Sequence, residues 1–382
     1  MRRITSGEIL HAHVLASAAT VASNLVEWFR LHRRDLPWRR NSDDAYSVWI
    51  SEVMLQQTQA ATVVPYYLLW MERWPTVTSL AAAPLDEVLA AWSGLGYYAR
   101  ARNIHRAAGM IVERFGGRIP SDAALLGSLP GVGLYTVGAI LSIAFNRPVP
   151  AMDVNAIRVL SRLMAADGTA AGARGAMEAL VTAMMSTEAA RDVTQALMEL
   201  GALVCLPTNP RCQECPILHL CRAAAAGRPD QWPAPRPKPK PVSVEHAAII
   251  IHRMGTYLVA RRHEMGRWGG LWEFPHRECL PNEPPEECAT RAAREVVGIY
   301  ASAGPCIARV RHRFTHYAVT LTAYQAGEWK GAPTAIGCAD VRWAHPRELT
   351  TLALSSPQKA IVKWLLDREC APRAGDYAEP VE

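Results

Sequence analysis

Residues 125–145, LLGSLPGVGLYTVGAILSIAF, decide what kind of fold the first half of the chain forms. Their apolar residues are spaced as in two helices, separated by the turn LPGVG at residues 129–133. Gly131 and Gly133 let the backbone turn tightly and come near a ligand. Free N–H groups at the start of the second helix favour a phosphate group without reading a sequence. The stretch predicts a helical hairpin suited to a phosphate backbone, although a Gly-x-Gly turn alone would be an ordinary interhelical connection.

Helical spacing continues on both sides of this hairpin, from about residue 20 to residue 225. Beyond a proline-rich stretch, the spacing becomes strand-like at residues 246–252, 257–261 and 318–324, with one helix expected at residues 286–297. The predicted fold class is therefore multidomain: an all-α domain followed by an α+β domain.

The length of 382 residues exceeds what one hydrophobic core usually organises. Alternating prolines between residues 229 and 241 forbid regular helix and favour a stiff, extended connection. The predicted division is an N-terminal extension at residues 1–20, a helical domain at 21–225, a linker at 226–244, an α+β domain at 245–367 and a tail at 368–382.

Composition excludes several classes of protein. Half of the residues are hydrophobic and a fifth are charged, as in ordinary globular proteins, and the formal charge of +6 only weakly favours a polyanionic partner. No apolar run approaches the roughly 18 residues that span a bilayer, so no membrane partner is expected. The N-terminus lacks the apolar core of a secretory signal, which favours a cytosolic protein.

A cysteine cluster lies at the end of the helical half, with the spacing C-x6-C-x2-C-x5-C. Four thiolates within one short segment are suited to zinc or to an iron-sulfur cluster, and the C-x2-C pair alone does not separate the two. Free buried cysteines are a third, weaker interpretation. The candidate ligands are Cys205, Cys212, Cys215 and Cys221.

Two carboxylates are candidate catalytic groups. Asp153 immediately precedes a helical run, where backbone N–H groups would keep it ionised and able to stabilise a cation; its alternative role is a simple helix cap. Glu52 lies in an apolar, amide-rich stretch at residues 47–59, where the surroundings would raise its pKa and keep it protonated as an acid. Its alternative role is a solvated helix glutamate.

Five motifs, taken in their order along the chain, together resemble those of one known protein family. They are LPWR at 36–39, SEVMLQQTQ at 51–59, GLGYYARARN at 94–103, LPGVG at 129–133 and the cysteine loop at 205–221. Together they resemble the MutY-type adenine DNA glycosylases of the endonuclease III-like helix-hairpin-helix superfamily, over about residues 22 to 366. The resemblance implies one 4Fe-4S cluster on the four cysteines and a glycosylase, a hydrolase of base-excision repair, that removes adenine mispaired with 8-oxoguanine or guanine.

The resemblance also implies residue roles. Glu52 matches the acid that protonates adenine N7, and Asp153 matches the carboxylate that stabilises the oxocarbenium-like sugar, with direct water attack and a covalent adduct both open. Other matched positions are Asn155, Tyr135 and Glu199 in the catalytic pocket, Trp38 and Arg39 around the adenine, Gln57 and Tyr97 in the duplex, and Arg100 and Arg102 on phosphates.

Tyr135 carries a further implication. Bifunctional relatives have a lysine at this position, which attacks the sugar to form a Schiff base. Tyrosine cannot do this, so the resemblance implies a monofunctional glycosylase without an efficient strand-cleaving step.

The second domain resembles a Nudix fold whose motif, GX5EX7REUXEEXGU, is incomplete. With Glu286 and Arg294 in the motif, Gly298 and Ile299 stand where metal-binding glutamates belong, so pyrophosphate hydrolysis is not expected. Phe314, Thr315 and His316 resemble the Phe-Ser-His loop that checks for 8-oxoguanine, with threonine in place of serine.

The expected partner is double-stranded DNA with an A:8-oxoguanine or A:G mispair, bound by a monomer that is cytoplasmic and nucleoid-associated if the source is bacterial. Two rival functions stay open at this stage. One is a catalytically silent lesion sensor, and the other is a nucleotide pyrophosphohydrolase centred on the second domain.

Overall fold

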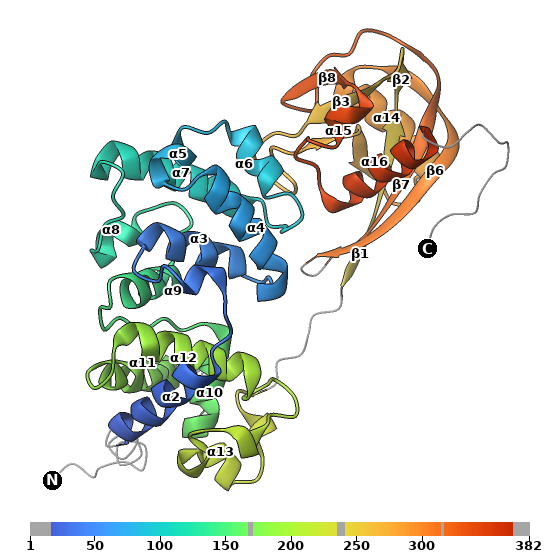
Figure 1. The fold of residues 1–382 in the computed structure, drawn as a ribbon. Coiled ribbons are helices and arrows are strands. Elements are labelled where there is room, and N and C mark those ends of the chain that lie inside the picture. The colour runs from blue at the N-terminus through green and yellow to red at the C-terminus, as the bar shows by residue number, and fades with distance from the viewer. Residues whose placement is uncertain (1–16, 167–170, 235–240, 315–316, 370–382) are drawn as a thin grey trace. The chain divides into compact units, whose positions relative to one another are not determined.

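The computed structural model describes residues 17–166, 171–234, 241–314 and 317–369. The chain divides into two compact units (Figure 1). The first comprises Met1–Ala82 and Arg106–Pro237, and the second comprises Ala83–His105 and Lys238–Glu382. The two units are described separately.

The first unit is helical throughout its described residues. Its elements are α2 (Ala18–His32), η1 (Pro37–Arg39), α3 (Ala45–Leu55), α4 (Ala60–Arg73), α5 (Val77–Ala81), α8 (Ala123–Gly127), α9 (Leu134–Ala139), the π-helical η2 (Ile140–Ala144), α10 (Val154–Met164), α11 (Ala171–Met185), α12 (Ala190–Leu203), η3 (Cys212–Glu214), η4 (Leu218–Leu220), α13 (Arg222–Ala225) and η5 (Pro229–Gln231). Helix α7 (Ala99–Phe115) begins in the second unit and ends in the first.

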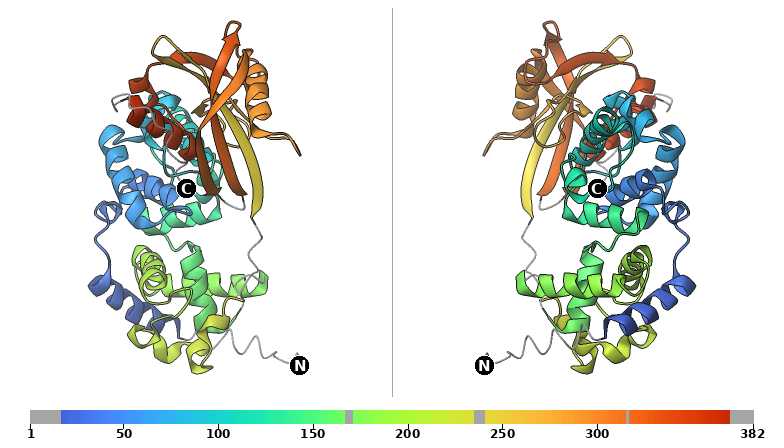
Figure 2. Two further views of the ribbon diagram at one scale, coloured as in Figure 1. Left: turned by 90° about the vertical axis from the view of Figure 1, so that its right-hand side faces the viewer. Right: turned by 90° about the vertical axis from the view of Figure 1, so that its left-hand side faces the viewer.

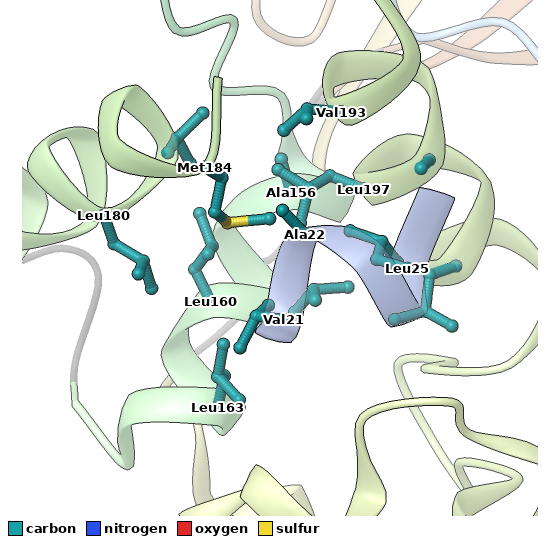
Figure 3. Close-up of a cluster of buried hydrophobic side chains, with 14 of the residues drawn as sticks. Val21, Ala22, Leu25, Ala156, Leu160, Leu163, Leu180, Met184, Val193 and Leu197 are labelled. Carbon is teal, nitrogen blue, oxygen red and sulfur yellow. The ribbon is translucent and has the colours of Figure 1, made fainter. Parts of the chain in front are cut away.

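Helices α2, α10, α11 and α12 enclose one hydrophobic core. Seven apolar residues of α2, from Ala18 to Phe29, recur at helical spacing and are buried, so one face of this helix is covered by the other three. Figure 3 shows Leu25 of α2 among Leu160 of α10, Met184 of α11 and Leu197 of α12, side chains that come from distant parts of the sequence. This core fixes the direction in which α10 and α12 present their polar residues.

The predicted helical hairpin is formed by α8 and α9. Asp122 caps α8 by accepting hydrogen bonds from the N–H groups of Ala124 and Leu125. Gly131 has a φ of 75°, in the left-handed region that glycine adopts without strain. Gly133 is the N-cap of α9, and the next residue, Leu134, is 89% exposed. The turn and the first N–H groups of α9 are therefore open to a ligand.

The second unit contains two four-stranded sheets, with strand orders β5-β1-β7-β6 and β2-β3-β4, β8 pairing with β3. The strands are β1 (Val242–Ile250), β2 (His252–Arg253), β3 (Thr256–Arg261), β4 (Trp272–Glu273), β5 (His276–Glu278), β6 (Tyr300–Phe314), β7 (Tyr317–Lys330) and β8 (Asp340–Ala344). Its helices are α6 (Leu85–Ala91), α14 (Pro285–Val297), α15 (Pro346–Leu349) and α16 (Ser356–Glu369).

Alternation along β1 separates two cores in this unit. Ala248 and Ile250 join a cluster that includes residues of β3, β7 and α16, whereas Ala247 and Ile249 join a cluster with α14. β1 and β7 run parallel, and β6 and β7 form a long antiparallel hairpin. The α+β class predicted for this part of the chain is confirmed.

The grouping of Ala83–His105 with the second unit was not anticipated by the sequence, which places these residues in the helical domain. The hydroxyl groups of Ser93 and Tyr98 both donate to the carbonyl of Leu354, at 2.8 and 2.9 Å. The ammonium group of Lys359 donates to the carbonyl of Ser93 at 3.0 Å. These contacts join residues more than 250 positions apart, which local sequence patterns do not report.

The core of the first unit gives a test of packing. Leu25→Ala on α2 removes a fully buried side chain and should lower the free energy of unfolding by about 2–5 kcal/mol. Leu31→Ala on the same helix removes a side chain that is 76% exposed and should change it by about 0.5 kcal/mol or less. Urea unfolding of the two variants measures the difference, and equal effects would contradict the assigned core.

Candidate active site

A cavity of about 1070 Å³ opens in the first unit between the hairpin, α3, α10 and α12. Almost all of the pocket residues named from the sequence line it. They are Trp38, Arg39, Glu52, Gln57, Gly131, Gly133, Tyr135, Asp153, Asn155 and Glu199. Residues as far apart in the chain as Trp38 and Glu199 thus share one cavity.

Glu52 is a buried acid that is bound by a residue of the hairpin. It lies near the end of α3, a helix started by Asp44, and only 6% of it is exposed. The hydroxyl of Tyr135, from the second residue of α9, donates a short hydrogen bond to its Oε2. Burial raises the pKa of Glu52 to about 7, the nearby charge of Asp153 adds to the rise, and the hydrogen bond from Tyr135 opposes it. A large fraction of this carboxyl is therefore protonated at neutral pH.

Asp153 is the N-cap of α10, as the sequence suggests. Its Oδ1 accepts the N–H of Ala156 at 2.6 Å, and its Oδ2 accepts the side-chain amide of Asn155 at 2.8 Å. Burial raises the pKa of Asp153 above its ordinary value, against these hydrogen bonds and the charge of Arg158. The donors expected from the sequence are therefore present at Asp153. The expectation that they alone would keep the carboxyl ionised did not take into account that burial raises its pKa.

Asn155 is held in turn by the next layer of residues. Its Oδ1 accepts a hydrogen bond from Arg158 at 2.8 Å, and the same guanidinium donates to the carbonyls of Gly201 and Cys205, each at 2.8 Å. A continuous chain of hydrogen bonds therefore leads from the Asp153 carboxylate to the first cysteine of the cysteine loop.

Glu199 is fully buried at the other end of the cavity and is bound by two arginines. Arg39 donates to both of its carboxylate oxygens at 2.9 and 2.8 Å, and Arg34 donates from its guanidinium and its backbone N–H. These hydrogen bonds outweigh burial and hold the pKa of Glu199 at about 2. Sequence reasoning missed Arg34, although it lies only two residues before the LPWR motif and its charge is what a buried glutamate requires.

The four cysteines of the loop line a second, largely apolar pocket in the first unit. None is in a disulfide. The buried guanidinium of Arg162 lies 3.4 Å from the Sγ of Cys205 and also donates to the carbonyls of Leu206 and Pro207. Within the described parts of the chain, no group of three or more histidine, cysteine or acidic side chains is arranged to hold a single metal ion.

Comparison with known proteins identifies the family. Residues 50–183 match the HhH-GPD superfamily base excision DNA repair proteins, and residues 246–364 match the NUDIX domain. The adenine DNA glycosylase of Mus musculus is 35% identical over 97% of this chain and 83% of its own length. That of Homo sapiens is 33% identical over 91% of this chain and 74% of its own. The chain belongs to the adenine DNA glycosylase family.

A solved structure supports the fold of the helical part. A thermostable thymine-DNA glycosylase has a TM-score of 0.51 and 26% sequence identity, covering 55% of this chain and 98% of its own. The fold class predicted from the sequence, a helix-hairpin-helix glycosylase domain followed by a Nudix-like domain, is confirmed.

The structure shows that the alignment of the Nudix motif on Glu286 and Arg294, expected from the sequence, is shifted by three residues. Glu283 and Arg291 are also separated by seven residues, and they form two hydrogen bonds of 2.7 Å. With Glu283 and Arg291 in the motif, Gly298 and Ile299 match the glycine and the aliphatic residue that end it, and no longer the positions of its paired glutamates. Of the metal-binding glutamates, only Glu295 remains, and it pairs with Arg291 and Arg277. Carboxylates are still too few for a magnesium site.

Three DNA-contact candidates lie outside the cavity, in the second unit. Tyr97 is 40% exposed and has a left-handed φ of 47°. The guanidinium of Arg100 donates to the carbonyls of Leu95 and Gly96, so it braces this loop. Arg102 donates to the carbonyl of Gly269 at 2.5 Å. Contact of Arg100 and Arg102 with phosphates stays a prediction, since both guanidinium groups already bind carbonyls.

The remaining candidates are less informative. Trp38 is almost fully buried and packs edge-on against Tyr67, with ring centroids 5.5 Å apart, so much of its role is structural. Thr315 and His316 lie outside the described residues, and of Phe314 only the backbone, the last residue of β6, is described. No helix in the described part of the chain is long and apolar enough to cross a membrane.

Gly201 offers a test of the chain of hydrogen bonds. A Cβ at this position would lie 2.6 Å from the Cβ of Asn155, so Gly201→Ala should displace Asn155 and, through it, Asp153. We expect about a 10- to 100-fold slower adenine release in single turnover. Gly175→Ala on α11 is the control, because its Cβ would meet nothing within 4 Å and the rate should not change. Equal rates for the two variants would contradict the assigned packing.

Proposed function

We propose that the protein hydrolyses the N-glycosidic bond of adenine mispaired with 8-oxoguanine or guanine in double-stranded DNA. The observation that carries this proposal is the presence of two carboxyl groups with different surroundings in one cavity. Glu52 is buried against a hydroxyl group, whereas Asp153 accepts hydrogen bonds from a helix start and an amide. Such a pair supplies both an acid and an anion to glycoside cleavage.

Glu52 has the properties of the general acid. Its raised pKa of about 7 leaves a proton on the carboxyl at neutral pH, and we assign that proton to adenine N7. Protonation withdraws electrons from the glycosidic bond and lets the base leave as a neutral molecule. The Tyr135 hydroxyl then stabilises the carboxylate that remains.

Asp153 has the properties of the anion that stabilises the cationic sugar. The Ala156 N–H and the Asn155 amide fix its orientation and favour its ionised form. Direct attack by water and a transient bond to Asp153 both require this carboxylate in the same place. Arg158 holds Asn155 and so acts as a positioning residue.

Tyr135 supports a monofunctional reaction. Burial and the neighbouring Glu52 raise its pKa well above the ordinary value of 10, so its oxygen stays a neutral hydroxyl. That hydroxyl is occupied by Glu52, and the position offers no amine for a Schiff base.

The flanking groups fit recognition of an extruded adenine. Arg39 presents one edge of its guanidinium to Glu199, and both residues of this ion pair line the cavity. Gln57 is exposed at the end of α3, with a left-handed φ of 60°. We propose that Gln57 and Tyr97 push into the duplex while the adenine enters the cavity.

The cysteine loop fits one 4Fe-4S cluster held by Cys205, Cys212, Cys215 and Cys221. Their common apolar pocket and the charge of Arg162 suit a large anionic group. When bound, the cluster would supply thiolate cross-links that fix the loop, and the Cys205 carbonyl would then anchor Arg158.

We propose that the second unit reads the base opposite adenine through the sequence Phe314-Thr315-His316, which lies in the chain where β6 ends and β7 begins. The rival pyrophosphohydrolase finds no support, because Glu295 is the one motif glutamate left and arginines neutralise it. A silent sensor would not need the arrangement of Glu52 and Asp153.

Single-turnover assays on a duplex with adenine opposite 8-oxoguanine, guanine or thymine test the function. The wild type should release free adenine from the first two duplexes and leave no trapped Schiff base. Glu52→Gln and Asp153→Asn should each slow release by about 100-fold or more while DNA binding is retained. Binding without adenine release by the wild type would establish the sensor instead.

The acid role predicts a pH profile. Because Glu52 must be protonated, the single-turnover rate should fall as pH rises through about 7. Tyr135→Phe removes the hydrogen bond that lowers the pKa of Glu52, so the falling limb should move to higher pH. A limb that stayed in place or moved to lower pH in Tyr135→Phe would count against Glu52 as the acid.

A further inference from the structure

The β6–β7 hairpin carries a row of arginines that the proposed chemistry does not use. Arg309, Arg311 and Arg313 alternate along β6 and are all exposed. Because strand side chains alternate between faces, the three lie on one face, about 7 Å apart from one to the next. We call them the arginine ladder.

The ladder differs from those arginines of the second unit that are held by a carboxylate. Arg262, Arg277 and Arg291 each pair with a glutamate of the same unit. No member of the ladder forms a hydrogen bond or an ion pair with any described residue. Three unpaired guanidinium groups in a row form a site of positive charge without an internal partner.

The surroundings of the ladder leave this face open. Its cross-strand neighbours on β7 are Ala318, Thr320 and Thr322, which are too short to cover an arginine. Toward the hairpin turn, β1, β6 and β7 extend beyond α14, which covers this sheet only at its other end (Figure 2). A long, flat anion could therefore lie along the strand and meet all three side chains.

We propose that the arginine ladder binds phosphates of the DNA strand that carries the base opposite the adenine. Charge complementarity selects a polyanion, and the repeat of about 7 Å spans the axial rise of about two nucleotides of one strand, at 3.4 Å each. We assign the DNA strand that carries the opposite base because Arg313 directly precedes Phe314, the first residue of the segment proposed to read that base. The ladder supplies position and affinity, while that segment supplies base recognition. This inference rests on the proposed function.

An alternative use of these charges is protection of the sheet edge. β6 is an edge strand, and exposed charges on such strands prevent pairing between molecules. That role would be satisfied by any charge on the edge and would leave DNA binding unchanged, so the two uses have different experimental signatures.

The test is the salt dependence of DNA binding by the full chain. The ladder variant Arg309→Gln, Arg311→Gln and Arg313→Gln binds a duplex in which a 2′-fluoro adenosine, slow to be cleaved, stands opposite 8-oxoguanine. Loss of three phosphate contacts should reduce the slope of log affinity against log salt by about 2 to 3. The control variant Arg253→Gln, Arg347→Gln and Arg368→Gln loses the same charge from exposed positions off the hairpin and should keep its slope.

Lysine at all three ladder positions should restore the slope, because phosphate contact requires the charge and not the guanidinium. Neutral methylphosphonate linkages beside the 8-oxoguanine should weaken the wild type but not the glutamine ladder variant. The same linkages beside the adenine should weaken both equally. If the triple variant does not fold, Arg311→Gln alone should lower the slope by about 0.9.

An unchanged slope in the ladder variant would overturn the proposal, as would a change no larger than that of the control. Association of the variant into larger species with an unchanged slope would assign the ladder to edge protection. Adenine release by the wild type distinguishes failure of the proposed function from failure of the ladder proposal. If the wild type releases no adenine, the proposed function is refuted. If it releases adenine but the ladder variant keeps its salt slope, only the assignment of the ladder to phosphates is refuted.

Discussion

The hydrogen bond from the Tyr135 hydroxyl to the Glu52 carboxyl is the interaction on which the site depends. It joins the second residue of the hairpin's second helix to the end of α3, so the phosphate-binding turn and the acid are positioned together. It also limits how far burial raises the pKa of Glu52. Without this donor the pKa of the carboxyl would rise further and its proton would be held more strongly, whereas an exposed carboxyl would have lost its proton at neutral pH.

The charge of the second carboxylate, Asp153, is stabilised in a different way. The helix start of α10 and the Asn155 amide stabilise the charge of Asp153, and Arg158 holds that amide against the backbone of the cysteine loop. Helix α10, which carries these residues, is packed into the core that it shares with α2, α11 and α12 (Figure 3). Residues that would not touch the substrate, such as Arg158, thus influence the charge state of Asp153, which would.

Sequence patterns predicted the parts of this account that are local. Helical spacing located α12 and α14, the N-cap position of Asp153 followed from its place before a helical run, and the apolar stretch around Glu52 indicated its raised pKa. Contacts between distant residues could not be read in the same way. Arg34 on Glu199 and Ser93 on Leu354 each join segments whose proximity only the fold creates.

The central claim is that one cavity holds a protonated glutamate beside an aspartate whose charge is stabilised by fixed donors. Infrared difference spectra between the wild type and Glu52→Gln, recorded across pH, measure the protonated carboxyl of Glu52 directly. The account predicts a band of the neutral carboxyl that disappears with a midpoint near pH 7 and that Asp153→Asn does not abolish. A midpoint near the ordinary glutamate value of about 4.3, or a band that belongs to Asp153, would contradict it.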